Sequence, residues 1–212
     1  MFPIWQLFWL LVCYVLGSIP TGLLVAQRLK GIDLSRHGSG NTGAANAVRA
    51  LGWSGGALVL ALDMLKGVVA VGLAYLGGLM LPALILPVIK VVYGMAAIIG
   101  HNYSIFRGFR GGKGIATSFG VVLALSPRVA ILAVLLWIAV VGLTRYSSVG
   151  SLAAAASLPI LMIVYRESVV YILFGFAAAA LAFYRHKDNI ERLREGKELR
   201  IDDKILGGGS ST

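Results

Sequence analysis

Long apolar runs fill most of the chain and alternate with short polar segments. A helix needs roughly 20 apolar residues to cross the hydrocarbon core of a bilayer, and several runs approach that length. Barrel strands would alternate polar and apolar positions, and these runs do not. The pattern therefore predicts membrane helices near residues 4–26, 53–78, 82–100, 114–125, 128–143, 149–164 and 168–184.

The composition agrees with a membrane protein. Of the 212 residues, 58% are hydrophobic and 13% are charged, whereas about 25% are charged in a typical soluble domain. The single cysteine, Cys13, excludes a disulfide within the chain, and we expect it to pack as a small hydrophobic residue. The first 27 residues contain no Lys or Arg, which argues against a cleaved signal peptide and for a retained helix. We expect an all-α, polytopic fold with about seven transmembrane helices.

The cationic residues are distributed unevenly between the connecting segments. Fifteen Lys and Arg residues fall in segments on one side of the predicted bundle, and only Arg128 and Arg166 fall on the other. By the positive-inside rule, the N-terminus lies outside and the C-terminus lies in the cytoplasm. Topology thus explains the net charge of +10, and because basic patches interleaved with aromatic residues are absent, we expect no nucleic-acid partner.

The first cytoplasmic segment combines glycines with hydrogen-bond donors. Its candidate phosphate ligands are Gly38, Ser39, Gly40, Asn41, Thr42 and Gly43. The glycines match a dinucleotide-binding spacing, but no strand precedes them, so that interpretation is not favoured. Glycines still allow backbone N–H groups to approach an anion, and a helix starting near Thr42 would favour a phosphate. The alternatives are a flexible loop or glycines that allow close helix packing.

The second segment places cations among glycines directly before a helix. It contains His101, Arg107, Arg110, Gly111, Gly112, Lys113 and Gly114. It is not a Walker A loop, because a glycine follows Lys113. Cations beside glycine backbone are typical of an anion cradle. Ordinary cytoplasmic charge is the alternative, although it would not require the three glycines.

Two further cytoplasmic segments carry polar groups. One is a short turn containing Arg145 and Ser148, and the other is the tail around His186 and Asn189. The tail could also be an amphipathic helix on the membrane surface. The chain has no metal-ligating cluster and no H-x-x-x-x-D acyltransferase motif. The four segments together therefore favour the binding and stabilisation of phosphate charge, without a metal or other cofactor.

Two charged residues lie within one predicted span. Asp63 and Lys66 are three positions apart and can share a helix face. Charges inside a membrane are costly, so they are expected to pair or to serve a site. The sequence leaves open whether these two are structural or contact a substrate.

The motifs in this order resemble the bacterial acyl-phosphate-dependent glycerol-3-phosphate acyltransferase family. They are GSIP at 17–20, GSGNTGAAN at 38–46, GHNYSIF at 100–106, GGKGIAT at 111–117, RYSS at 145–148 and YRHKDNIERL at 184–193. The resemblance covers the chain from about residue 17 to about residue 195. Ala45 stands where many members have Thr, and Arg107 and Arg110 stand where Lys is frequent. Because Arg and Lys differ in geometry, these departures could alter affinity.

The resemblance implies a compact bundle of seven helices with its active site near the cytoplasmic face of the bacterial inner membrane. It implies acyl transfer from acyl phosphate to the 1-hydroxyl of glycerol-3-phosphate, giving lysophosphatidic acid and phosphate. A soluble partner acyltransferase would supply the donor, and membrane lipid would surround the fold. We expect one transmembrane acyltransferase domain over residues 1–206 and a flexible tail or linker over residues 207–212.

The family's functional residues fall on identifiable positions of this chain. Those implied to be catalytic are Ser39, Arg49, Lys113, Ser148, His186 and Asn189. Those implied to bind substrate or phosphate are Gly38, Gly40, Asn41, Thr42, Gly43, His101, Arg110, Gly111, Gly112, Gly114 and Arg145.

Two other function classes remain open at this point. A transporter or channel for phosphate-bearing anions could use the same basic loops, but it needs a pathway to the outside, where the connections are short and nearly uncharged. A non-catalytic membrane anchor would leave the glycine and cation segments unexplained.

Overall fold

The computed structural model describes residues 4–79 and 81–203, and every regular element in these ranges is a helix. The α-helices are α1 (Ile4–Ser18), α2 (Thr21–Lys30), α3 (Ala44–Leu51), α4 (Trp53–Gly77), α5 (Leu86–Asn102), α6 (Ile115–Leu125), α7 (Pro127–Thr144), α8 (Ser147–Val164), α9 (Val169–Arg185) and α10 (Lys187–Arg194). Short 3₁₀ turns cover Leu34–Arg36, Ala83–Ile85 and Ile105–Arg107. The all-α prediction is confirmed, whereas the predicted tail at residues 207–212 lies outside the described residues.

Each predicted apolar run coincides with helical structure, and α4 to α9 begin or end within a few residues of the predicted limits. Within the described residues, five helical segments are long and apolar enough to cross a membrane, with α1 and α2 counted together as one. The bent pair of α9 and α10 would make a sixth, whereas α6 has only 11 residues. The chain is therefore a multi-pass membrane protein, and the count of seven crossings stays a prediction.

The first predicted span, 4–26, is interrupted between α1 and α2. Pro20 lies at this break, because its ring and missing N–H group do not fit inside a helix. The Ile19 carbonyl that the break frees accepts a hydrogen bond from Lys66 Nζ of α4 at 2.6 Å. The helix interruption is thus stabilised from a neighbouring helix.

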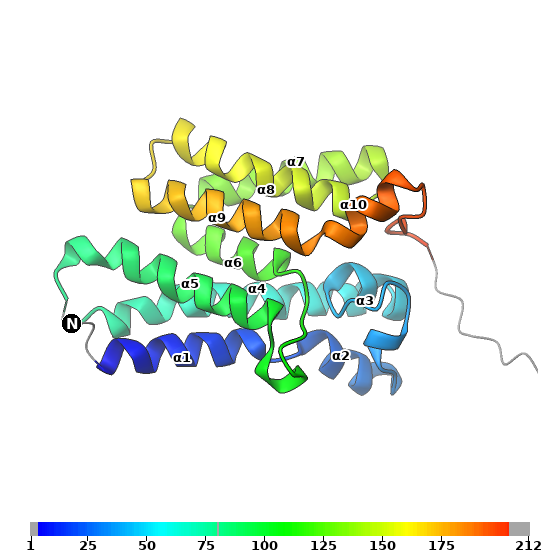
Figure 1. Ribbon diagram of the computed structural model, residues 1–212, viewed down its shortest axis with the longest axis horizontal. Coiled ribbons are helices and arrows are strands. Elements are labelled where there is room, and N and C mark those ends of the chain that lie inside the picture. The colour runs from blue at the N-terminus through cyan, green and yellow to red at the C-terminus, as the bar shows by residue number, and fades with distance from the viewer. Residues whose placement is uncertain (1–3, 80, 204–212) are drawn as a thin grey trace, which may run out of the picture.

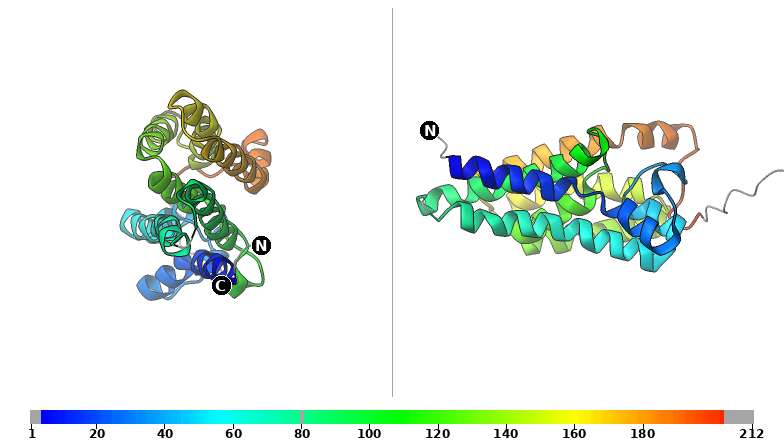
Figure 2. Two further views of the ribbon diagram at one scale, coloured as in Figure 1. Left: turned by 90° about the vertical axis from the view of Figure 1, so that its left-hand side faces the viewer. Right: turned by 90° about the horizontal axis from the view of Figure 1, so that it is seen from below.

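The helices form two groups with α6 between them. Helices α1, α4 and α5 pack together, as do α7, α8 and α9, and α6 contacts members of both groups. The end-on view in Figure 2 shows this arrangement. The contact between α4 and α6 requires glycine, since a Cβ atom on Gly67 or Gly120 would overlap backbone of the facing helix. Small residues here allow the close approach that joins the two groups.

A hydrophobic core joins α6 to the helices around it. It includes Val121 and Val122 of α6, Leu158 and Met162 of α8, and Phe174 of α9. Many large apolar side chains instead lie on the outer surface of the helices. Such a surface suits a lipid surrounding rather than water.

The polar segments gather at one end of the bundle. Helices α2, α3 and α10 lie at the right-hand end in Figure 1, opposite the end where α1 begins. The described part of the C-terminus, residues 196–203, returns to this same end and contacts α3 and the turn between α7 and α8. The fold therefore brings together four segments that are far apart in the sequence.

Candidate functional site

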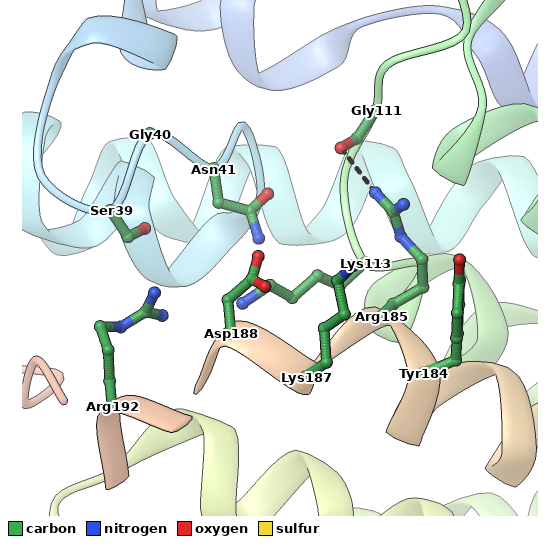
Figure 3. Close-up of a pocket in the computed structure, with 10 residues that line it drawn as sticks. All are labelled: Ser39, Gly40, Asn41, Gly111, Lys113, Tyr184, Arg185, Lys187, Asp188 and Arg192. Carbon is green, nitrogen blue, oxygen red and sulfur yellow. Dashed lines mark hydrogen bonds between the residues drawn. The ribbon is translucent and has the colours of Figure 1, made fainter. Parts of the chain in front are cut away.

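Two adjoining cavities lie at the polar end of the bundle. The larger has a volume of about 380 Å³ and extends from α3, α10 and the C-terminal segment down between α4, α6, α7, α8 and α9. The smaller, called the vestibule here, has a volume of about 230 Å³. Its lining residues are Ser39, Gly40, Asn41, Gly111, Lys113, Tyr184, Arg185, Lys187, Asp188 and Arg192 (Figure 3). Four of these residues, Ser39, Asn41, Lys113 and Arg192, line both cavities, so the two spaces share a wall.

The inner part of the large cavity is apolar. Its walls carry Leu60 and Met64 from α4, Phe119 from α6, Trp137 from α7 and Leu158 from α8. Alanines of α7, α8 and α9 supply much of the remaining wall, and their small side chains leave the space open. Such a cavity favours the binding of a long alkyl group, because burial of each CH₂ stabilises the bound state by about 0.8 kcal/mol.

A chain of hydrogen bonds organises the polar end of the large cavity. Lys113 Nζ donates to Asn189 Oδ1, and Asn189 Nδ2 donates to Glu198 Oε1 at 2.5 Å. Ser148 Oγ donates to the same carboxylate oxygen at 2.8 Å, and Arg192 Nε donates to Glu198 Oε2 at 2.8 Å. One buried carboxylate therefore orients groups from α8 and α10 and, through Asn189, the Lys113 ammonium.

The C-terminal segment, residues 196–203, also contacts α3. Arg49 donates from Nε to the Arg200 carbonyl at 2.9 Å and from Nη2 to the Leu199 carbonyl at 3.0 Å. The segment donates a backbone N–H to the Arg145 carbonyl at 2.9 Å. These bonds hold the segment against the large cavity, which Leu199 and Ile201 border. Within residues 4–79 and 81–203, no group accepts from Arg49 Nη1, whose N–H groups could therefore bind an anion.

His186 lies just beyond the C-terminal end of α9 and faces the large cavity. Its Nδ1 lies 2.7 Å from the Ala182 carbonyl. A carbonyl can only accept, so Nδ1 carries the proton and Nε2 is left as an acceptor. Burial, with a further contribution from the Lys113 charge, lowers the pKa of His186 to about 4. The imidazole is therefore neutral at pH 7.

Lys113 is partly withdrawn from water. Burial lowers the pKa of its ammonium to about 8, although Glu198 acts in the opposite direction. An anion entering the cavity would favour the charged form and raise this pKa again. Lys113 is therefore suited to bind an anion, and its charge depends on whether an anion occupies the cavity.

The first glycine segment is held in a defined conformation by Asn46, a buried residue of α3. Asn46 Nδ2 lies within 3.2 Å of the carbonyls of Leu34, His37 and Asn41. Its Oδ1 accepts from the Ser39 backbone N–H at 3.2 Å. The flexible-loop alternative therefore does not describe this segment, because one side chain organises it.

Close packing explains the glycines of the second segment. A Cβ atom on Gly111 or Gly112 would overlap the backbone or ring of His101. At Gly114, where φ is +77°, a Cβ atom would lie 2.6 Å from Asn102 Oδ1. The segment thus lies against the end of α5, and this contact places Lys113 between the two cavities.

The structure brings together most of the residues predicted for the site. All six predicted catalytic residues border the large cavity: Ser39, Arg49, Lys113, Ser148, His186 and Asn189. The predicted phosphate-binding residues are divided among three spaces. The large cavity is bordered by Asn41, Gly43, His101 and Gly114, and the vestibule by Gly40, Asn41 and Gly111. A small space of about 10 Å³ is bordered by Thr42 and Gly112. Gly38, Arg110 and Arg145 border none of these three spaces.

Glu198 and Arg192 are site residues that the sequence does not single out. Glu198 is one of several carboxylates in a charged tail, and only its return to the bundle shows its place beside Ser148. Arg192 borders both cavities and binds Glu198. No spacing or motif could have linked a residue of the tail to a turn 50 positions earlier.

A second buried cluster lies deeper in the bundle. Asp63 Oδ1 accepts from Thr21 Oγ1 and from Lys66 Nζ, the latter at 2.7 Å, and lies 3.5 Å from His101 Nδ1. Asp63 is 1% exposed and Lys66 is 4% exposed. The cluster joins the start of α2 to α4 and α5, next to the interruption after α1.

Comparison with known proteins gives a consistent result. Residues 7–196 match the sequence model of a protein family described as Glycerol-3-phosphate acyltransferase. The chain is 46% identical to Glycerol-3-phosphate acyltransferase 2 of Moorella thermoacetica, over 92% of this chain and 97% of that protein. It is 43% identical to Glycerol-3-phosphate acyltransferase of Rippkaea orientalis, over 95% of this chain and 96% of that protein.

Two solved structures are also similar. Both are crystal structures of PlsY, an integral membrane glycerol 3-phosphate acyltransferase. The glycerol 3-phosphate form is 40% identical with a TM-score of 0.83, and the lysophosphatidic acid form is 39% identical with a TM-score of 0.82. Each match covers 92% of this chain and 94% of the solved chain.

Proposed function

Because the chain belongs to the glycerol-3-phosphate acyltransferase family, we propose that it transfers a fatty acyl group from acyl phosphate to the 1-hydroxyl of glycerol-3-phosphate. The products are lysophosphatidic acid and inorganic phosphate. The solved relatives in glycerol 3-phosphate and lysophosphatidic acid forms support an acceptor and a product of these kinds. This reaction would be the first step of phospholipid synthesis in the membrane in which the enzyme lies.

One observation carries the proposal: a cation-rich polar pocket and a long apolar cavity are one continuous space. An acyl phosphate has the same two parts, an alkyl chain and a phosphate. With the chain between α4 and α7–α9, its head group reaches Lys113 and Arg49 at the polar end. A wholly polar metabolite would make no favourable contact with the apolar walls of the cavity.

The polar residues have distinct roles in this proposal. Lys113 and Arg49 neutralise phosphate charge, and backbone N–H groups of the glycine segments add donors. Ser148, His186 and Asn189 hold the acceptor, which explains why they face the same cavity. Phosphate is a good leaving group, so charge stabilisation and positioning supply most of the rate.

A substrate phosphate is the better acceptor for the hydroxyl proton. The second pKa of a phosphate monoester is about 6, whereas burial lowers the pKa of His186 to about 4. Burial thus makes His186 a poor proton acceptor, which favours the substrate phosphate in that role. In this version His186 orients the acceptor. If His186→Ala abolished turnover and left the affinity for glycerol-3-phosphate unchanged, His186 and not the substrate phosphate would be the base.

We place the active site at the cytoplasmic face of the bacterial inner membrane. The excess of Lys and Arg in the segments at this end of the bundle supports that orientation. Glycerol-3-phosphate would then reach the site from the cytoplasm. The acyl phosphate, made by a soluble partner acyltransferase, would enter from the membrane side.

The decisive experiment measures phosphate release by purified, lipid-reconstituted protein given palmitoyl phosphate, with and without glycerol-3-phosphate. We expect release that depends on glycerol-3-phosphate, together with lysophosphatidic acid of matching amount. Lys113→Ala should reduce kcat/KM by roughly 10²–10³-fold, the usual effect of removing one charge-stabilising donor.

Lys197→Ala is the matched control, since Lys197 is an exposed lysine that pairs with Glu195 outside both cavities. It should retain wild-type turnover. An absence of turnover from folded wild-type protein would rule out the proposed enzyme. Uptake of glycerol-3-phosphate into vesicles without chemical change would instead support the transporter.

A further inference from the structure

The loop between α5 and α6 carries an unusual set of side chains. Its first part, residues 103–110, begins directly after α5 and leads to the glycine segment that contains Lys113. Loop side chains are normally polar, because they meet water. Here, however, Ile105 is 49% exposed, Phe106 is 59% exposed and Phe109 is 62% exposed. None of the three belongs to a hydrophobic core of the described residues, so these apolar side chains project from the loop.

The backbone of the loop fixes the position of these side chains. The N–H groups of Arg107 and Phe109 donate to the Ser104 carbonyl at 3.1 and 2.8 Å. Gly108 and Phe109 both have left-handed backbone conformations, with φ of +57° and +61°. This conformation is unfavourable for a bulky side chain, and such residues are concentrated at functional positions. A strained aromatic residue that contributes to no core therefore points to a partner outside the chain.

The loop lies where two membrane-crossing segments end. The Ser104 hydroxyl donates to the carbonyl of Ser18, the last residue of α1, at 2.6 Å, and the Tyr14 hydroxyl donates to the Tyr103 carbonyl at 2.8 Å. In Figure 1 the green loop after α5 extends past α1 to the lower edge of the molecule, beside the junction of α1 and α2. Both α1 and α5 belong to segments that are long and apolar enough to cross a membrane. The loop is therefore at the depth where helices leave the hydrocarbon, a level that aromatic side chains prefer.

The same loop presents positive charge. Arg110 is exposed, and its side chain forms no ion pair within residues 4–79 and 81–203. The sequence predicts Arg110 to bind phosphate, but it borders none of the three spaces at the polar end. Arg107 is half-buried near Asp33, whose carboxylate pairs with Arg36 at 3.5 Å. The guanidinium of Arg110 is therefore free beside the apolar side chains.

We propose that residues 103–110 form a lipid-binding loop that takes an acidic phospholipid of the surrounding bilayer. Phe106 and Phe109 would lie at the boundary of the acyl chains, and Arg110 would bind the headgroup phosphate. An acidic soluble protein would match the arginine, but it would not explain why the apolar side chains lie at the depth of the bilayer surface. The proposal goes beyond acyl transfer and does not depend on it.

Fluorescence quenching by brominated lipid measures the depth of the loop. The reporter is Phe106→Trp, in bilayers in which part of the lipid carries bromine on its acyl chains. We expect stronger quenching than in the wild-type protein, whose four tryptophans provide the background. Lys197→Trp is the control, because it adds a tryptophan at an exposed position of the tail and should add no quenching. Ile105→Trp is a second reporter and should behave like Phe106→Trp.

The choice of headgroup is measured with the same reporter. Brominated phosphatidylglycerol in phosphatidylcholine is compared with brominated phosphatidylcholine in phosphatidylglycerol. We expect phosphatidylglycerol to associate with the loop about fivefold more strongly, the ratio that corresponds to one cation at an anionic membrane surface. Arg110→Gln in the Phe106→Trp protein should remove most of this preference. Lys197→Gln in the same protein should leave it unchanged.

The absence of added quenching in both reporters would place the loop in water and overturn the proposal. Quenching without a headgroup preference, or with a preference that Arg110→Gln leaves intact, would overturn the assignment of an acidic lipid. Phe106 and Arg110 are exposed, so their replacement should leave the fold intact. Neither measurement requires turnover. A protein that gave the expected quenching but transferred no acyl group would keep the lipid-binding loop, whereas the proposed function would fail.

Discussion

Two buried carboxylates, Asp63 and Glu198, lie in different regions of the molecule and have closely matched partners. Asp63 accepts from the hydroxyl of Thr21 and pairs with Lys66. Glu198 accepts from the hydroxyl of Ser148 and pairs with Arg192. The first joins helices within the bundle, and the second belongs to the segment that returns to the polar end of the large cavity.

Burial and pairing do not distinguish these clusters, but the positions of their cationic partners, Arg192 and Lys66, do. Ser148, Asn189 and Arg192, the partners of Glu198, all border the large cavity. Asp63 and His101 also border the large cavity, whereas Lys66 borders the small space of about 10 Å³ beside the interruption after α1. That volume is about the size of one water molecule. We therefore expect the Asp63–Lys66 pair to act mainly on stability and Glu198 to act mainly on turnover.

Asp63→Ala should have the largest effect and should act on stability. It leaves the Lys66 charge buried without its carboxylate, which typically costs about 3–5 kcal/mol. Denaturant unfolding of the protein in detergent should show this loss. The double variant Asp63→Asn with Lys66→Met removes both charges and should recover much of the stability. Unfolding of Asp63→Ala at the wild-type midpoint would contradict the structural role.

Glu198→Gln should act mainly on turnover. The amide oxygen can still accept from Ser148, but the charge that attracts Arg192 is lost and one of the donors loses a good partner. We expect kcat/KM to fall about tenfold, with less loss of stability than in Asp63→Ala. Steady-state kinetics and unfolding of the same preparation separate the two effects. Glu195→Gln, on the exposed part of the tail, should change neither.

The pH dependence of kcat/KM should follow the charge of Lys113, which is connected to Glu198 through Asn189. Burial lowers the pKa of Lys113 to about 8 in the folded protein. The charged form binds phosphate, so kcat/KM should fall as pH rises through about 8 and then by about tenfold per pH unit. Lys113→Arg should move this decline to higher pH. A profile that stays flat to pH 10 would show that the Lys113 charge is not required.

Residues in the apolar part of the large cavity should affect the choice of acyl donor. Leu158 and Ala178 line the cavity and belong to the core that closes it. Ala178→Leu should lower kcat/KM for long-chain acyl phosphates relative to short ones by roughly 5- to 30-fold, since one or two methylenes correspond to about 1–2 kcal/mol. Leu158→Ala should shift the preference the other way. An unchanged chain-length profile in both variants would place the chain elsewhere.

The sequence predicts the helices well and the site in part. Apolar runs locate α4 to α9 because lipid-facing and core-facing residues are both hydrophobic. The sequence does not locate the interruption after α1, although it contains Pro20, because the stabilisation of this break by Lys66 depends on a different helix. The glycine and cation segments predict Lys113 and Ser39, and both residues border the two cavities. Glu198 escapes prediction because its role depends on a contact between distant parts of the chain.

The wall that Lys113 shares between the two cavities has a kinetic consequence. In the proposed reaction the acyl donor would arrive from the bilayer and the acceptor from bulk water, and Lys113 lines both of the spaces at which they would meet. The saturation constant of the donor is therefore set by its mole fraction in the bilayer, and that of the acceptor by its molar concentration. Dilution of the donor with inert lipid should slow the reaction even when the total amounts of protein and donor are held fixed.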